Sequence, residues 1–247
     1  MRSIRRLPLN VNTLKHLERR QAAINAQLDS GRLEPKTIQQ SWKNASKSKN
    51  LKTVRNTLEQ MSGGRCRCMY CEDSVGTDIE HYRPKRTYPR HMFVWENLLL
   101  GCSLCNQMKD EHFQMEDGVP LLLDPTCDNP WEHLDFDPVT GNLVPRFNRS
   151  TGSESPMGIM TVKILQLDRR EALSTGYLRS YRRIVELLSG LSSLPQTAEE
   201  LISRLQLADE HGLLFWGFHG NGRNDRPFRN FKATRPDLWD ACESAFA

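Results

Sequence analysis

The chain has 247 residues, of which 38% are hydrophobic, so it can bury the core of one or two ordinary domains. Its 15 glycines and 13 prolines are too few for a low-complexity or collagen-like protein. The longest apolar runs, such as residues 98–100, fall far short of the roughly 20 residues that span a bilayer, and no apolar stretch follows the basic N-terminus. We therefore expect a soluble, cytoplasmic protein without a membrane segment.

The formal net charge of +4 is unevenly distributed along the chain. Residues 1–60 contain 13 basic and four acidic side chains, whereas residues 61–125 contain seven basic and ten acidic ones. Such asymmetry indicates contact with a polyanion, although solvated basic helices would give the same pattern. The basic region is expected either to attract nucleic acid or to dock an acidic face of a partner protein.

Helical periodicity dominates the first part of the chain. Apolar residues at helical spacing predict a helix over 13–29, with Asn12 or Thr13 as its N-cap. A second helical stretch begins near Pro35 and either continues or restarts after residues 46–50. The N-terminal part is therefore predicted to be a basic helical region.

The rest of the chain changes character twice. From residue 65 onward Cys, Pro, Tyr and His concentrate, and we expect short strands over 77–81 and 93–100 and a helix from Asn106 through residue 113. Further on, turns rich in Asp-Pro and Asn-Pro precede renewed helical patterning around 157–190 and 197–210, while the tail after Gly217 resists assignment. The sequence predicts an α+β, mainly helical chain with regions over 1–64, 65–125 and 126–247.

The cysteines are the first sign of a metal site. Seven cysteines in a chain without an export signal argue against a disulfide framework. Four of them form two C-x-x-C pairs, Cys68 with Cys71 and Cys102 with Cys105, and such pairs supply tetrahedral zinc ligands with little strain. Cys66 is an alternative ligand. Because four thiolates close the coordination sphere, we expect a structural zinc.

A second set of residues lies between and just after the cysteine pairs. His81 can take a proton from water, and Asn97 can orient its ring. The carboxylate of Glu80 and the amide oxygen of Asn106 can hold a catalytic Mg²⁺ or Mn²⁺, which would neutralise charge on a phosphodiester. These four residues provide what metal-assisted phosphodiester hydrolysis requires.

Several neighbouring residues are alternatives or additions to this set. His112 is the alternative to Asn106 as a ligand, and Asp78 shares a strand face with Glu80 but is left outside the core site. Contacts with phosphate groups are expected from Arg83, Lys85, Arg86 and Lys109.

The order C-x-x-C, Glu-His, Asn, C-x-x-C-Asn resembles that of zinc-knuckle HNH endonucleases. The resemblance implies a ββα-metal (HNH) core with a structural zinc, flanked by helical regions. It also implies that Glu80 and Asn106 bind the catalytic metal, that His81 is the general base, and that the paired cysteines hold the zinc. Asn106 makes this an H-N-N form of the motif instead of an H-N-H form, and its side chain leaves an oxygen ligand available.

Longer segments, including EHYRPKRTYP and NLLLGCSLCNQMKDEHF, resemble PtuB, the HNH subunit of Septu-type anti-phage systems, which also accompany some retrons. The resemblance implies a DNA endonuclease that works with an ABC-type ATPase, PtuA. This chain contains no G-x-x-x-x-G-K-[ST] motif of its own. Two alternatives stay open: an HNH effector that cleaves RNA such as tRNA, and a non-catalytic zinc-ribbon module that binds nucleic acid.

Overall fold

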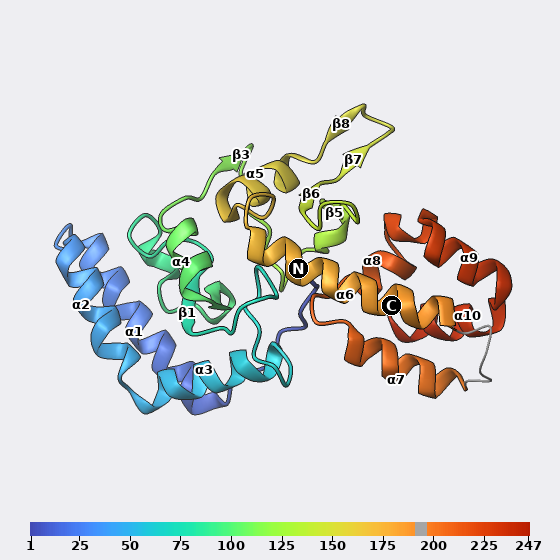
Figure 1. Cartoon of the computed structure of the whole chain (residues 1–247). Coiled ribbons are helices and arrows are strands. Elements are labelled where there is room, and N and C mark those ends of the chain that lie inside the picture. The colour runs from blue at the N-terminus through green and yellow to red at the C-terminus, as the bar shows by residue number, and fades with distance from the viewer. Residues whose placement is uncertain (191–196) are drawn as a thin grey trace. The chain divides into compact units, whose positions relative to one another are not determined.

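The computed structural model of the protein describes residues 1–190 and 197–247, which form two compact units (Figure 1). One unit contains residues 4–70 and 74–120, and the other contains residues 1–3, 71–73 and 121–247. Helices predominate, and the described strands form two-stranded antiparallel sheets. The predicted α+β, mainly helical class is therefore confirmed, whereas the division into three regions stays a prediction.

Three helices begin the unit that contains residues 4–70 and 74–120: α1 (Val11–Asp29), α2 (Pro35–Ser46) and α3 (Lys49–Met61). The N-cap of α1 is Asn10, whose side chain accepts a hydrogen bond from the Thr13 amide, so the cap predicted at Asn12 or Thr13 was misplaced. The second helical stretch restarts because the extended Ser48 accepts a hydrogen bond from the Leu51 amide and caps α3. The buried face of α3 packs against strand β2 (Leu98–Gly101).

Two strands and a short helix follow in this unit. Strand β1 (Asp78–His81) pairs antiparallel with β2 (Leu98–Gly101), which places His81 opposite Leu98. The second strand is shorter than predicted because residues Trp95–Asn97 form a 3₁₀ turn, η2, before it. Another 3₁₀ turn, η1 (Pro89–His91), and the small pair β3 (Met115–Glu116) and β4 (Val119–Pro120) complete the unit.

Helix α4 (Ser103–Lys109) differs from its prediction at both ends. It begins early because the Cys102 side chain accepts a hydrogen bond from the Cys105 amide and acts as the N-cap. It ends early because Asp110 has a φ of 38°, which a helix cannot continue through. The prediction of a helix over residues 106–113 was therefore wrong in its bounds.

The other unit holds two small sheets and six helices among the described residues. Its strands and 3₁₀ turns are η3 (Pro130–Glu132), β5 (Leu134–Phe136), β6 (Leu143–Pro145), β7 (Phe147–Asn148), β8 (Ser153–Glu154) and η5 (Asn221–Asn224). Its helices are α5 (Pro156–Leu165), α6 (Glu171–Ser189), α7 (Ala198–Ala208), α8 (Leu213–Phe218), α9 (Arg226–Thr234) and α10 (Pro236–Ala245). The left-handed Gln166 separates α5 from α6 within the helical pattern predicted around 157–190.

The tail that resisted assignment is helical and packs around aromatic side chains. Phe228 meets both Trp216 and Phe218 edge to face, with the Trp216 and Phe228 centroids 5.9 Å apart. Gly217 lies against the Phe228 ring so closely that a Cβ would collide with it, which explains a glycine inside this apolar helix.

None of the helices within residues 1–190 and 197–247 is long and apolar enough to cross a membrane.

Candidate functional site

The four paired cysteines come together. The sulfur atoms of Cys68, Cys71, Cys102 and Cys105 lie within 4.8 Å of one another, and all four residues are buried. Tetrahedral zinc with Zn–S bonds of about 2.3 Å needs neighbouring sulfurs about 3.8 Å apart, which this cluster can adopt with small adjustments. The donor set therefore fits a structural zinc, as predicted. Cys66 is not part of the cluster.

Backbone contacts hold the first cysteine pair in a tight turn. The Cys68 amide donates to the Ser74 carbonyl, and the Gly76 amide donates to the Cys66 carbonyl. The Met69 amide donates to the carbonyl of Leu100 in β2, which places this turn beside the strand that leads into the second pair. The cysteine cluster thus ties the turn to the start of α4.

Glu80 is buried and forms an ion pair with a residue of α4. Its Oε1 lies 2.9 Å from the Nζ of Lys109, whose side chain is completely buried. Burial raises the pKa of Glu80, and the positive charge of Lys109 opposes that rise. The ammonium group of Lys109 therefore provides the positive charge beside this carboxylate in the structure.

The ring of His81 is fixed from two sides. Its Nε2 lies 3.1 Å from the Met92 carbonyl oxygen, which can only accept, so the proton of neutral His81 is on Nε2 and the lone pair is on Nδ1. The indole of Trp42 in α2 covers the ring edge to face, with centroids 4.2 Å apart. Burial, assisted by the positive charge of Lys85, lowers the pKa of His81 to about 3. The ring is therefore neutral at physiological pH.

Asn97 acts on the loop that follows β1. Its side chain accepts from the Arg83 amide and donates to the carbonyls of Arg83 and His91. It makes no hydrogen bond with the His81 ring among the described residues. Met92, whose carbonyl oxygen contacts the His81 ring, directly follows His91. Asn97 therefore acts on the His81 ring indirectly, by holding the segment of residues 91–92 in place.

Asn106 lies next to Asp78 at the edge of a cavity. The Asn106 amide donates to Asp78 Oδ2 over 3.3 Å, and both residues line a cavity of about 470 Å³. Trp42 and the turn between α2 and α3 form the other side of this cavity. We call it the basic cavity because its lining includes Lys47, Lys49, Lys52 and Arg55. Two oxygen-bearing side chains that could hold a hard cation therefore face a cavity, whereas Glu80 is not part of its lining.

The remaining predicted site residues are dispersed. Lys109 is buried, so it does not offer a surface contact to phosphate in this structure. Arg83 stacks over the rings of Tyr88 and Phe113, and the exposed Arg86 lies 3.9 Å from a carboxylate oxygen of Glu111. Lys85 is half-buried. His112 is exposed and lies beyond the end of α4, whereas the sequence predicted a helix that continues past it.

Two contacts of this site were not predicted from the sequence. The sequence predicts no contact between Trp42 and His81, and it predicts Lys109 as a phosphate contact and not as the partner of a buried carboxylate. Both contacts join residues that are far apart in the chain, and no local pattern marks them. Lysine side chains are also rarely buried, so the separation of Glu80 and Lys109 in the sequence does not by itself indicate a buried ion pair.

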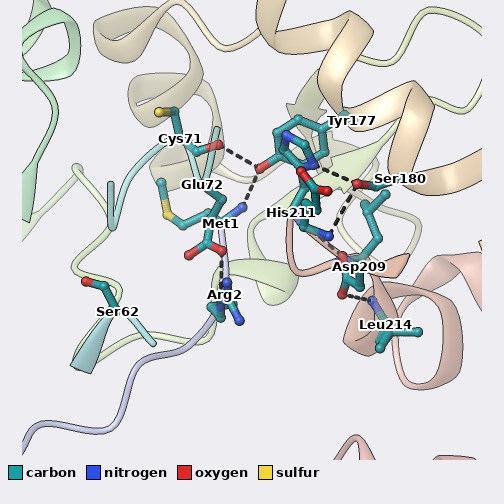
Figure 2. Close-up of polar contacts among 12 residues, drawn as sticks. Met1, Arg2, Ser62, Cys71, Glu72, Tyr177, Ser180, Asp209, His211 and Leu214 are labelled. Atoms are coloured by element: carbon teal, nitrogen blue, oxygen red, sulfur yellow. Dashed lines mark hydrogen bonds and ion pairs between the residues drawn. The ribbon is translucent and has the colours of Figure 1, made fainter. Parts of the chain in front are cut away.

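The other unit contains a separate buried polar cluster. Figure 2 shows the Tyr177 hydroxyl between the Met1 amine and the Cys71 carbonyl, and Glu72 paired with Arg2 over 2.6 Å. Nearby, His211 lies 2.8 Å from the Ser180 hydroxyl and 3.3 Å from Asp73.

Ser180, His211 and Asp73 are arranged in the order of a hydrolase triad, but a substrate cannot reach the serine. Ser180 is completely buried, and its hydroxyl oxygen also accepts a hydrogen bond from the Glu210 amide. A nucleophile needs room for substrate beside it. We therefore regard the cluster as structural.

Comparison with known proteins gives two similar sequences. The chain is 32% identical over 177 residues to a Septu protein PtuB of Bacillus mycoides, a match that covers 58% of this chain and 57% of the relative. It is 27% identical over 164 residues to a Septu protein PtuB of Bacillus thuringiensis, covering 62% of this chain and 59% of the relative. No family model and no solved structure matches the chain.

The chain thus spans less than two thirds of the length of the curated relatives it matches. The resemblance to PtuB that the motifs predicted is confirmed over about three fifths of the chain.

Proposed function

We propose that the protein is a metal-dependent HNH endonuclease that hydrolyses phosphodiester bonds of DNA, and that it works with an ABC-type, PtuA-like ATPase in anti-phage defence. The similarity to proteins named Septu PtuB supports the defence role. The nuclease activity, its metal and the partner are inferred from the site.

The observation that carries the proposal is the succession β1, β2 and α4 beside the cysteine cluster. Glu80 and His81 end β1, Asn97 immediately precedes β2, and Asn106 lies on α4. The cluster stabilises the turn before β1 and the N-terminus of α4. We infer that these three elements form the ββα-metal core of the HNH motif.

The chemistry follows from the His81 ring. Its Nδ1 lone pair can take a proton from water as the water oxygen bonds to phosphorus and the bond from phosphorus to the leaving sugar oxygen breaks. The Met92 carbonyl keeps the ring in the required tautomer. The ring must first be uncovered, and displacement of Trp42 would return its pKa toward the ordinary value of about 6.5.

The residues around the ring also suit a divalent cation. Asn106 together with Asp78 or Glu80 supplies the hard oxygen ligands that Mg²⁺ or Mn²⁺ prefers. When bound there, the cation would neutralise charge on the scissile phosphate. For Glu80 to serve as a ligand, the Lys109 ammonium must give way.

The first prediction tests the general base. Plasmid DNA is incubated with Mg²⁺ or Mn²⁺ and the full chain co-purified with its ATPase, comparing wild type with His81→Ala and with His16→Ala, a control on α1. We expect His81→Ala to lower the cleavage rate by about 10²–10⁴-fold and His16→Ala to leave it unchanged. Equal cleavage by His81→Ala and wild type would contradict the assignment.

One observation favours a second function. His81 is 4% exposed and Glu80 is neutralised by Lys109, which suits a non-catalytic zinc module that binds nucleic acid. Under this alternative, wild-type complex binds DNA but does not cleave it with either metal, and His81→Ala changes neither property.

A further inference from the structure

We propose that the basic cavity binds the sugar-phosphate backbone of the nucleic acid that is cut. The cavity lies between the turn joining α2 to α3 on one side and Thr77–Ile79 with Asn106 on the other. The inference rests on the proposed function, because it assigns the substrate to that site. It names residues outside the phosphate contacts that the sequence suggested.

The lining of the cavity is strongly cationic. Lys47, Lys49, Lys52 and Arg55 all contribute to it, against the single carboxylate of Asp78. The three lysines are exposed and have no ion pair among the described residues, whereas Arg55 pairs with Glu59. Three unneutralised ammonium groups beside one cavity create a positive potential that suits a polyanion.

The lysines at the start of α3 do not stabilise that helix. Lys49 is the first residue of α3 and Lys52 lies one turn further, while the first turn contains no acidic residue. Positive charge at a helix N-terminus is unfavourable because the helix dipole is positive there. Stability of α3 therefore does not explain the lysines, whereas an anionic ligand does.

The spacing of the cations also fits a polynucleotide. Lys49, Lys52 and Arg55 follow one another at intervals of three residues along α3, so they extend over about 9 Å of its axis. One strand carries a phosphate about every 3.4 Å of its axis, so a stretch of this length passes roughly two or three phosphates. The helix therefore places several cations beside a short run of phosphates.

The opposite side of the cavity leads to the candidate catalytic groups. Asp78 and Asn106 face the same space as the lysines, and Trp42 in the lining touches the His81 ring. A backbone held by the lysines would present its phosphodiester beside these groups. An acidic protein face docked in the same place would cover them, so we favour nucleic acid over the ATPase as the occupant.

The test compares two triple variants that remove the same charge. Lys47→Gln/Lys49→Gln/Lys52→Gln neutralises the cavity, and Lys15→Gln/Lys36→Gln/Lys43→Gln neutralises three exposed lysines outside its lining. Binding of the zinc-loaded full chain to duplex DNA, and to RNA of the same sequence, is measured between about 50 and 200 mM salt without added Mg²⁺ or Mn²⁺. Thermal melting verifies that both variants are folded.

We expect the cavity variant to bind about tenfold to hundredfold more weakly, and its log–log salt slope to become shallower by about 2 to 3. The affinity of the control variant should stay within about twofold of the wild-type value, and its log–log salt slope should differ from wild type by no more than about one. The probe that loses more affinity identifies DNA or RNA as the substrate class. Equal losses in both variants would overturn the inference, because they would indicate diffuse attraction.

Unchanged nucleic acid binding with loss of ATPase co-purification would also overturn it, since the cavity would then be a protein dock. The binding measurement does not depend on the result of the cleavage assay. If wild type cuts DNA in a His81-dependent manner but the cavity variant binds normally, the inference fails alone. If binding depends on the cavity but wild type and His81→Ala show the same cleavage, the proposed nuclease fails alone.

Discussion

At the scale of single residues, the ion pair of Lys109 with Glu80 has the largest expected effect on stability. Both side chains are buried, and their charged atoms lie 2.9 Å apart. Removing one partner of a buried pair leaves a desolvated charge without compensation. We predict that Lys109→Met lowers the free energy of unfolding of the zinc-loaded chain by about 3 kcal/mol, measured by urea denaturation.

Two further variants make this prediction specific. Adding Glu80→Gln to Lys109→Met should recover part of the loss, because the carboxylate that was left unpaired is gone. Lys85→Met, which changes a half-buried lysine, should cost less than about 1 kcal/mol. If Lys109→Met unfolds at the same urea concentration as wild type, the ion pair does not stabilise the protein in solution.

At the scale of secondary structure, the cysteine cluster and α4 depend on each other. Cys102 is both a predicted zinc ligand and the N-cap of α4. Structural zinc contributes about 10–16 kcal/mol in small zinc-binding peptides, as much as the whole stability of an ordinary domain. We predict that Cys102→Ser abolishes stable zinc binding and the cooperative melting of this part of the chain.

Metal analysis by mass spectrometry and circular dichroism melting would measure these two effects. Cys127→Ser is the matched control, since Cys127 is exposed and outside the cluster. It should keep one zinc per chain and the wild-type melting temperature. Retention of zinc by Cys102→Ser would exclude the four-cysteine site as the zinc site.

The sequence predicted elements well where periodicity was strong and capping was local. The helix over 13–29 and the strand near residues 77–81 agree with α1 and β1. The bounds of α4 could not be predicted, because its start depends on a cysteine acting as a cap and its end on the positive φ of Asp110. The helices of the C-terminal tail were missed because the close approach of Gly217 to Phe228 is a tertiary property.

The candidate site was predictable to a similar extent. The cysteine cluster followed from spacing alone, and so did the placement of Glu80 and His81 at the end of a strand. The cover that Trp42 forms over His81 could not follow from spacing, because it joins segments far apart in the sequence. The catalytic roles themselves stay predictions.

At the scale of the whole molecule, the basic N-terminal region supplies both charge and core. Lys49 and Lys52 at the cavity lie on α3, which also carries Leu51, Val54 and Leu58, and these three apolar side chains are almost completely buried. Burial of each such side chain contributes about 1.5–3 kcal/mol, and an ordinary domain is stable by only about 5–15 kcal/mol. Deleting residues 1–60 would therefore remove packing as well as charge, and it would uncover His81 and β2.

We predict that a chain of residues 61–247 loses cooperative melting of the zinc-containing unit and retains less zinc than the full chain. The Lys47→Gln/Lys49→Gln/Lys52→Gln variant should retain both properties, because its side chains are exposed. Circular dichroism melting and zinc content measure the difference. If the truncated chain melts like wild type and keeps its zinc, the N-terminal helices are an independent module, and their charge can be studied by deletion instead of substitution.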